Sequence, residues 1–259
     1  MTDWIGVAPD ILAIMMLVGL AAGFLDAIAG GGGLLTVPAL ALAGLDPAAA
    51  VATNKVNSTM GLSAAAGAFA RRGAYRDADS WTFAAGAAIG ALAGALALSS
   101  VPTTWLAAAM PVVLVVIALY FAFTPSLGDR DRAPRASLAL AAGVFAPLVG
   151  FYDGVFGPGA GSFYMIVCVA ALGRAAVAAT AQTKLANLAS ALASLVAYAY
   201  MGKIVWALGL SMGLAQSVGA ALGARAAMAG GARLIRPLIV LASLAMAARL
   251  AYRAGWFGG

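Results

Sequence analysis

The sequence predicts an all-α polytopic membrane protein that consists of two related halves. Two observations predict the membrane class: 64% of the 259 residues are hydrophobic and 9% are charged, whereas about 25% of the residues in a soluble domain are charged. The third observation is that one pattern of Asp, Lys and Gly residues occurs twice along the chain. This recurrence predicts two homologous repeats of four apolar segments each.

The first apolar segment is interrupted by glycines. Residues 11–29 form an apolar run that is long enough to cross a membrane, since a spanning helix needs roughly 20 residues. Four glycines at 30–33 break this run, and the apolar piece that follows, 34–43, is too short to span alone. A second helix is expected from Asp46-Pro47 to about residue 70, where Arg and Gly follow as stop signals.

The third segment carries glycines at every fourth position. Gly86, Gly90 and Gly94 share one face of a helix expected over residues 81–98, and small residues at this spacing let helices pack closely. A fourth segment follows from 102 to about 124. We therefore expect a first transmembrane repeat at 1–125, a polar cytoplasmic linker at 126–135 and a second transmembrane repeat at 136–259.

The second half repeats the polar residues of the first at a nearly constant offset, which is hard to obtain from Ala-rich composition alone. The equivalent pairs are Asp26 and Asp153, Gly30 and Gly157, Lys55 and Lys184, Gly73 and Gly202, Gly90 and Gly219, and Gly94 and Gly223. Each half therefore begins with a helix that is broken by Gly or Pro. Two such breaks at matching positions are the best sequence indication of a transporter's binding site.

Equivalent connections of the two halves carry opposite charge bias. The connection after the second segment holds three arginines in the first half and only Lys203 in the second, and the connection after the third segment shows the reverse. The arginines are Arg71, Arg72 and Arg76 in the first half and Arg225, Arg233 and Arg236 in the second. Because cytoplasmic loops are rich in Lys and Arg, this bias favours inverted repeats.

Inversion requires an odd number of crossings in each half. The broken first segment of each half is then a re-entrant hairpin, the other three segments span, and both termini are external. The total of basic residues on each side discriminates poorly between this topology and eight simple crossings with internal termini. The second topology therefore stays open, as does a spanning first segment.

Four ionisable residues lie at membrane depth, where a charge at a helix centre costs about 2.5 to 3.5 kcal/mol and indicates function. They are Asp26, Asp153, Lys55 and Lys184. Two ammonium groups among amides and hydroxyls suit a small oxyanion, and the helix N-termini after the glycine breaks attract anions. The candidate substrate-binding residues are Lys55, Lys184, Asn54, Asn57, Thr183, Asn187, Gln182, Gly32, Gly33, Gly159, Gly161 and Ser162, with Asp26 and Asp153 as coupling or structural acids.

Other interpretations of these residues remain open. Each Asp could neutralise a Lys and only hold the bundle together, or the acids could bind protons during a transport cycle. An anion channel could use the same amines, and a cation carrier could use Asp26 and Asp153. A membrane-embedded enzyme is disfavoured because the chain has no His and because its single cysteine, Cys168, lies in an apolar segment, where packing is the expected role.

Composition also restricts the partners. The formal net charge is +6, but the arginines stand in short clusters between apolar spans, which is typical of cytoplasmic loops rather than of a nucleic-acid surface. The expected partners are the lipid bilayer and a small anionic substrate, with no nucleic acid and no cofactor. The first apolar run lacks a basic region before it, so we expect it to be retained rather than cleaved as a signal peptide.

Several motifs resemble the TauE/SafE family of sulfite exporters and sulfonate permeases. They are Asp-x-x-x-Gly-Gly-Gly-Gly-x-x-x-x-Pro at 26–38, Thr-Asn-Lys at 53–55, Arg-Arg-Gly at 71–73 and Gly-Phe-Tyr-Asp-Gly-x-Phe-Gly-Pro-Gly at 150–159. The similarity extends over about residues 19–252. It implies a secondary transporter of the bacterial inner membrane that exports sulfite, sulfonates, sulfoacetate or similar oxyanions. The resemblance also implies variation at the Asn54-Lys55 pair, where some members of the family carry a plainer Thr/Ser pair, and we expect this variation to tune the substrate.

Overall fold

In a computed structural model of the chain, residues 9–75, 77–98 and 131–228 are described, together with single positions between 100 and 116 and residues 248 and 252. The described residues form helices and connections, without a strand. The fourth segment predicted for each half, residues 126–130 of the predicted linker, and Arg76, Arg233 and Arg236 lie wholly or mostly outside the described part.

Helices α1 (Pro9–Ala29) and α2 (Gly33–Leu42) form a hairpin. Gly30 ends α1 with φ of +78°, a left-handed conformation that glycine adopts without steric cost. Leu34 at the start of α2 packs with residues near the end of α1, whereas Leu40 packs near Met15 at its beginning. The two helices are therefore antiparallel, and the break that the sequence predicts after residue 29 is confirmed.

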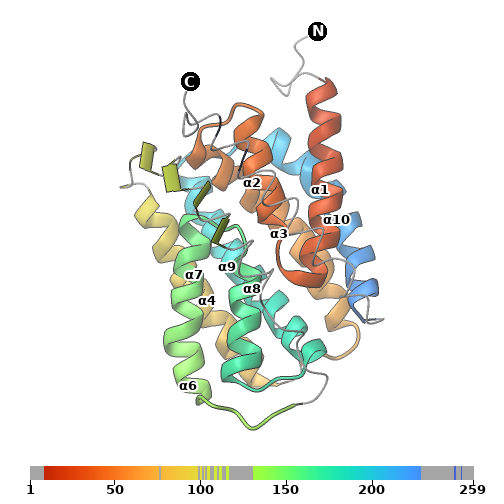
Figure 1. Ribbon diagram of the computed structural model, residues 1–259, viewed down its shortest axis with the longest axis vertical. Coiled ribbons are helices and arrows are strands. Elements are labelled where there is room, and N and C mark those ends of the chain that lie inside the picture. The colour runs from red at the N-terminus through yellow and green to blue at the C-terminus, as the bar shows by residue number, and fades with distance from the viewer. Residues whose placement is uncertain are drawn as a thin grey trace.

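A second hairpin forms in the second half. Helices α6 (Leu138–Leu140), η1 (Ala141–Phe145) and α7 (Ala146–Val155) make one continuous rod. Its five-residue π-helical stretch directly precedes the turn with Pro147, whose nitrogen cannot donate a hydrogen bond. Helix α8 (Ala160–Ile166) continues into η2 (Val167–Ala171). In Figure 1 this hairpin enters the bundle from the bottom, and the hairpin of α1 and α2 enters from the top.

Four further helices pack with the hairpins: α3 (Pro47–Ala70), α4 (Ala78–Leu98), α9 (Ala176–Tyr200) and α10 (Trp206–Met228). The start of α3 agrees with the Asp-Pro signal, because Asp46 accepts hydrogen bonds from the backbone N–H groups of Ala48 (3.0 Å) and Ala49 (3.2 Å). Helices α3 and α9 pack against each other. Helix α3 also packs against α10, and α9 also packs against α4.

Among the described helices, four are long and apolar enough to cross a membrane. These spans are Asp10–Ile28, Ala78–Leu98, Leu138–Val155 and Trp206–Met228. Helices α3 and α9 have sufficient length, with 24 and 25 residues, but they carry the buried lysines and amides. The predicted class, an all-α polytopic membrane protein, is confirmed at this level.

The two halves pack through glycines. Helix α1 lies against α10, and α7 lies against α4. A Cβ atom at Gly90 would lie 2.0 Å from the carbonyl oxygen of Pro147, and one at Gly219 would lie 2.0 Å from that of Leu20. No side chain fits at such contacts, so the predicted packing role of the glycines on α4 is confirmed. We call the seam these two contacts, the contact of α3 with α9, and the contacts of the two hairpin tips with α3 and α9.

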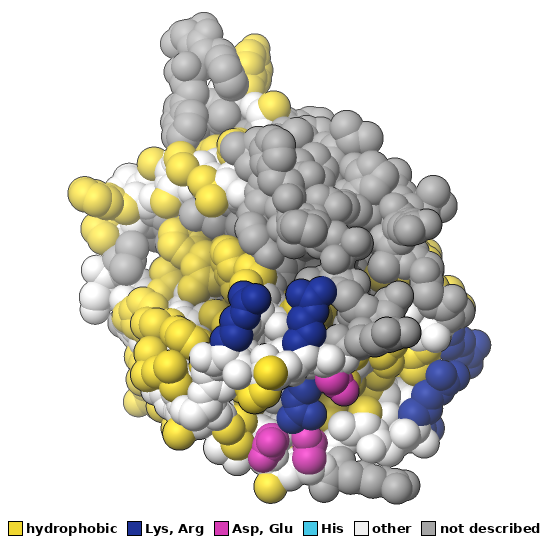
Figure 2. Space-filling view, turned by 60° about the horizontal axis from the view of Figure 1, so that its bottom comes forward, with side chains coloured by type: hydrophobic (Ala, Val, Ile, Leu, Met, Phe, Trp, Pro, Cys, Tyr) yellow, Lys and Arg dark blue, Asp and Glu magenta, His cyan; other side chains and the backbone are white. Residues whose placement is uncertain are grey.

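Charged loops gather at one end of the molecule, which faces the viewer in Figure 2. Here residues 131–136 bind the connection before α9, since the N–H of Arg132 donates to the carbonyl of Gly173 (2.8 Å). Arg174 in that connection forms an ion pair with Asp77 (3.1 Å), which lies just before α4. The described arginines of these loops and of the end of α10 are Arg71, Arg72, Arg132, Arg135, Arg174 and Arg225. Lys203, between α9 and α10, belongs to the opposite end.

Candidate functional site

The tips of the two hairpins meet inside the bundle. A Cβ atom at Gly30 would lie 2.7 Å from the backbone of Gly161, and one at Gly33 would lie 3.0 Å from the Cα of Pro158. Gly157 and Gly159 both have positive φ, +86° and +79°, so the second tip also relies on glycine. Backbone that is not helical is tolerated at membrane depth only where it is buried in protein or lines a cavity, and these tips satisfy that condition.

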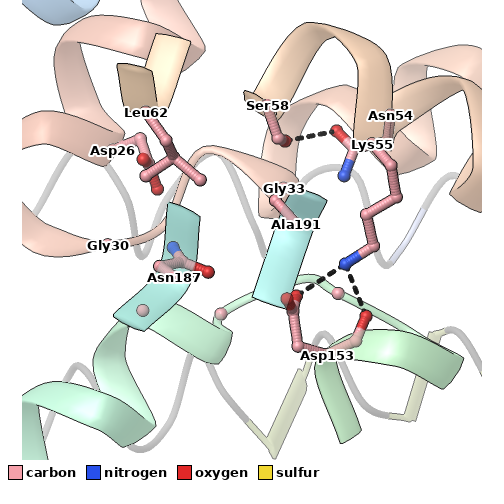
Figure 3. A pocket seen from close by; sticks show the side chains of 13 residues that line it. Asp26, Gly30, Gly33, Asn54, Lys55, Ser58, Leu62, Asp153, Asn187 and Ala191 are labelled. Carbon is pink, nitrogen blue, oxygen red and sulfur yellow. Dashed lines mark hydrogen bonds and ion pairs between the residues drawn. The ribbon is translucent and has the colours of Figure 1, made fainter. Parts of the chain in front are cut away.

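A small pocket opens where the tips approach α3 and α9 (Figure 3). Its walls combine backbone of the glycine breaks with polar side chains of the two long helices. The lining residues are Asp26, Gly30, Gly33, Asn54, Lys55, Ser58, Leu62, Asp153, Gly157, Gly159, Gly161, Asn187 and Ala191. The pocket therefore receives residues from both halves of the chain.

Lys55 on α3 binds the tip of the second hairpin. Its Nζ donates to the Oδ1 of Asp153 (2.8 Å) and to the carbonyl oxygen of the same residue (2.6 Å), as Figure 3 shows. The second carboxylate oxygen, Oδ2, accepts a hydrogen bond from the hydroxyl of Ser190 (2.5 Å). Both charged side chains are almost completely buried, with exposed fractions of 2% and 4%.

Lys184 on α9 binds the tip of the first hairpin in the corresponding way. Its Nζ donates to the carbonyl oxygen of Asp26 and lies 3.6 Å from the Oδ2 of that residue. The other oxygen of Asp26, Oδ1, accepts the backbone N–H of Gly32 (3.1 Å). Each lysine thus pairs with the aspartate of the other half, and the four charges sum to zero. The ion pairs that are required if each Asp only neutralises a Lys and holds the bundle together are therefore present.

Asn54 is oriented by two hydroxyl groups. Its Oδ1 accepts hydrogen bonds from Thr36 on α2 and from Ser58 one turn later on α3 (3.3 Å). This arrangement leaves the amide nitrogen of Asn54 as a donor on the pocket side, beside the ammonium group of Lys55 (Figure 3). Asn187 contributes a second amide from α9.

The predicted site residues separate into two groups. Those that line the pocket are Asp26, Gly33, Asn54, Lys55, Asp153, Gly159, Gly161 and Asn187. The others, Gly32, Asn57, Ser162, Gln182, Thr183 and Lys184, are buried but lie outside the lining. Lys184 contacts the pocket through Asp26, and the hydroxyl of Thr183 instead lies 3.9 Å from the sulfur of Cys168. Cys168 is fully buried in an apolar cluster, so its predicted packing role is confirmed.

Sequence reasoning missed three hydroxyl groups that position the site. Ser190 binds Asp153, Thr36 binds Asn54, and Tyr198 donates to the carbonyl of Gly154 near the second tip. A signal for Ser190 was present, because Thr183 and Asn187 continue at helical spacing to Ser190 and Ser194. Thr36 had no such signal, since its contact with Asn54 joins two helices.

Buried amides provide a further observation. Within the described residues, both polar atoms of the Asn57 and Gln182 side chains are buried without a hydrogen-bond partner. An unpaired buried polar group costs about 1 to 3 kcal/mol and calls for a ligand, water or a different conformation. The described residues contain no group of three or more His, Cys, Asp or Glu side chains that could hold a metal ion.

These features define a class: a polytopic helical protein with two broken hairpins and a polar pocket between its halves is a membrane transporter. The comparisons agree. The profile of the sulfite exporter TauE/SafE family matches residues 15–250, so the chain belongs to this family, and the resemblance read from its motifs is confirmed.

Relatives of known sequence carry the same class in their names. A "probable membrane transporter protein" of Haemophilus influenzae is 42% identical over 248 residues, covering 96% of this chain and 97% of the relative. "Probable membrane transporter protein ORF9" of a Sinorhizobium species is 42% identical over 240 residues, covering 93% and 92%. "Probable membrane transporter protein YfcA" of Escherichia coli K12 is 41% identical over 246 residues, covering 95% and 91%. No solved structure matches the chain.

Proposed function

We propose that this protein is a secondary transporter that exports small sulfur-containing or organic oxyanions, such as sulfite, sulfonates or sulfoacetate, by proton-coupled alternating access. The observation that carries the proposal is the pocket between the two hairpin tips, into which one ammonium group and two amides project. Donors of this kind, with glycine N–H groups beside them, suit an oxyanion.

The anion binds near the midplane, between Lys55 and Lys184. Asn54, Asn187 and the backbone of Gly33, Gly159 and Gly161 lie around this position in the present conformation. Asn57, Gln182, Thr183, Gly32 and Ser162 join the site when the halves move, and this assignment is supported by the unpartnered amides of Asn57 and Gln182. Polar groups without partners in one conformation are explained if another conformation uses them.

The repeats are inverted, and the halves rock around the site. Three observations support this part of the proposal. The hairpins enter from opposite ends (Figure 1), α1 pairs with α10 as α7 pairs with α4, and each lysine pairs with the aspartate of the other half. A two-fold relation in the membrane plane produces all three.

The arginine-rich end lies in the cytoplasm, and the termini are external. Six described arginines lie in the loops and helix end at this side and Lys203 lies in the connection between α9 and α10, and the positive-inside rule supports this orientation. The membrane is the bacterial inner membrane, in keeping with relatives from Haemophilus, Sinorhizobium and Escherichia.

Coupling to protons follows from the charge balance. The two Lys and two Asp residues are neutral as a set, and an additional anion at membrane depth is costly unless a positive charge accompanies it. Protonation of one aspartate supplies that charge, because it leaves one ammonium group without its carboxylate.

The proposal is tested by thermal stabilisation of the detergent-purified protein against sulfite, sulfonates, carboxylates and simple cations. A specific ligand raises the apparent stability by mass action. We expect a shift with a sulfur oxyanion that is absent in Lys55→Ala and in Lys184→Ala and is retained in Lys203→Ala, a matched lysine variant at an exposed turn. In proteoliposomes both site variants should lose flux of that anion.

Three outcomes would contradict the proposal. Normal flux in both site variants would exclude the lysines as the anion site. Stabilisation by cations alone, lost in Asp26→Asn or Asp153→Asn, would make the protein a cation carrier. Voltage-dependent currents that neither saturate at low substrate nor depend on a counter-ion would make it an anion channel.

A further inference from the structure

The two aspartates of the site are held differently. Asp153 receives a donor on each carboxylate oxygen, the ammonium group of Lys55 at 2.8 Å and the hydroxyl of Ser190 at 2.5 Å. Hydrogen bonds to both oxygens stabilise the ionised form of a carboxyl group. Both oxygens of the Asp153 carboxylate are therefore held by donors from other helices.

Asp26 is contacted by a backbone N–H instead of a hydroxyl group, and its lysine is farther from the carboxylate. Its Oδ1 accepts the N–H of Gly32, but its Oδ2 lies 3.6 Å from the Nζ of Lys184, too far for a strong hydrogen bond. The hydrogen bond that Lys184 donates goes to the carbonyl oxygen of Asp26 instead. The Asp26 side chain is also the more exposed of the two acids, at 10% against 4%.

The sequence explains the difference. Ser190 lies six residues after Lys184 on α9, and the residue six positions after Lys55 on α3 is Gly61. Glycine has no side chain to donate, and the space beside it is occupied by the side chain of Gln216. Helix α3 therefore has no hydroxyl group in the place that Ser190 takes on α9, and the hydrogen bond to the Asp26 carboxylate comes from the backbone N–H of Gly32.

We propose that Asp26 binds the coupling proton and thereby frees Lys184 for the anion, whereas Asp153 stays ionised and keeps Lys55 fixed. This inference rests on the proposed function and assigns its proton to one of two related acids. When the Oδ2 of Asp26 is protonated, the ammonium group of Lys184 loses its counter-ion, so a monovalent anion can take the place of the carboxylate.

The charged surroundings of Asp26 are consistent with this role. Of the helices packed against α1, α9 supplies Lys184, α3 supplies Lys55, and α10 carries Arg225 in its last turn. Helix α2 has no titratable side chain, and α8 has only the buried Tyr164. Lys55 is bound to Asp153, which leaves Lys184 as the cation that responds to Asp26.

The charge balance gives a stoichiometry. The empty site is neutral, and a site with one proton and one monovalent anion is neutral again. Proton and anion therefore travel together, and an outward flux of a monovalent anion carries one proton out with each anion. A sulfonate such as isethionate is a suitable probe because its sulfonate group stays ionised near neutral pH, so any proton that is taken up belongs to the protein.

The proton site is tested without any substrate by infrared difference spectroscopy of the purified full-length protein between about pH 8 and pH 5. Exposed Asp side chains, with ordinary pKa values of about 3.9, remain ionised over this range. We expect a C=O band of a protonated carboxyl group that is absent in Asp26→Asn and retained in Asp153→Asn. A band that is lost in Asp153→Asn instead, or no band in the wild type, would overturn the assignment.

Variants that keep all charges provide the control for misfolding. Asp26→Glu should shift the frequency of the band, and Asp153→Glu should leave it in place. Ser190→Ala should add a second band, because Asp153 then loses the donor on its Oδ2. An unchanged spectrum in both Asp26→Glu and Ser190→Ala would also overturn the proposal.

Isethionate binding in weakly buffered solution then separates this inference from the proposed function. We expect uptake of one proton for each anion bound, and no proton uptake in Asp26→Asn. If no anion of the panel binds, the proposed anion transport is wrong, and so is the role of Lys184 as an anion ligand. The carboxyl band would still identify Asp26 as the residue that binds a proton. If anions bind and the band belongs to Asp153, the function stands and this inference fails.

Discussion

The protein contains ion pairs of similar geometry in two very different places. At the seam, Lys55 and Asp153 approach to 2.8 Å with side chains that are 2% and 4% exposed. In the loops of the arginine-rich end, Arg174 and Asp77 approach to 3.1 Å with side chains that are 30% and 39% exposed. Water screens the second pair and not the first, so the two contacts differ much more in energy than in distance.

Burial makes the seam pair sensitive rather than simply stabilising. Removing two charges from water costs several kcal/mol for each ion, and the pair offsets this cost only while both partners are present. Arg174 and Asp77 lose little hydration when they pair, and breaking their ion pair leaves both groups in contact with water. The seam should therefore respond strongly to changes that the loops tolerate.

The largest effect is expected for Lys55→Ala, which leaves the carboxylate of Asp153 buried without its partner. Breaking a buried pair in this way typically costs about 3 to 5 kcal/mol. We expect a fall in unfolding free energy of this order, measured by denaturant unfolding in detergent micelles, together with loss of anion flux.

The double variant Lys55→Ala/Asp153→Ala controls for the stranded charge. It should be more stable than Lys55→Ala alone and should still lack flux, because stability depends on the balance of charges whereas transport depends on the lysine. A double variant as unstable as the single one would show that packing, and not the uncompensated charge, causes the loss. Lys203→Ala should change neither property.

A smaller effect is expected at the glycine contacts of the seam. In Gly90→Ala the new methyl group would meet the carbonyl oxygen of Pro147 at 2.0 Å, so α4 and α7 have to separate, and overpacking of this kind costs about 1 to 3 kcal/mol. Gly67→Ala in α3 is the matched control, since no atom beyond its chain neighbours and the backbone of its own helix lies within 4 Å of its Cβ position.

The control should be neutral or slightly stabilising, because Ala exceeds Gly in helix propensity by about 0.5 to 1 kcal/mol. Thermal unfolding of both variants in the same detergent measures the difference. Equal effects of the two substitutions on stability would mean that the close contact between α4 and α7 is not essential for packing. They would also contradict the claim that the seam is more sensitive to substitution than the rest of the protein.

Many residues of the seam could be predicted from the sequence because their immediate sequence context makes them unusual. Charges and amides in apolar runs are rare, and a glycine break inside such a run ends a helix wherever it falls. Asp26, Lys55, Asp153 and Lys184 were therefore found from composition and spacing alone, and the helices before the two breaks end at Ala29 and Val155, close to the glycines of the pattern.

The partners of these residues could not be predicted in the same way. Spacing along a helix tells which residues share a face, but it does not tell which aspartate a lysine meets across the bundle. Tertiary packing determines that Lys55 and Lys184 each pair with the aspartate of the other half. It also determines the contact of Thr36 with Asn54. The same is true of Asn57, which shares a helix with Lys55 but lies outside the pocket lining.

The smallest effect is expected in the loops, for Arg174→Gln. Exposed ion pairs contribute about 0.2 to 1 kcal/mol and are screened by salt, although Arg174 also lies 3.6 Å from Asp79. Partial burial raises the pKa of Asp77, but hydrogen bonds from Ser80 and Arg174 outweigh this effect and leave the pKa below its ordinary value.

The sign of the pH dependence follows from that lowered pKa. A carboxyl group with a depressed folded pKa stabilises the protein above its unfolded pKa, and this contribution disappears as the pH falls through the folded value. We expect Arg174→Gln to be slightly less stable than the wild type near neutral pH and low salt, and the difference to shrink as the pH falls below the ordinary pKa of Asp, about 3.9, or in 1 M salt. Anion flux should be retained. A loss of flux in Arg174→Gln would mean that the loop pair takes part in the transport cycle, and the division between a sensitive seam and tolerant loops would then be wrong.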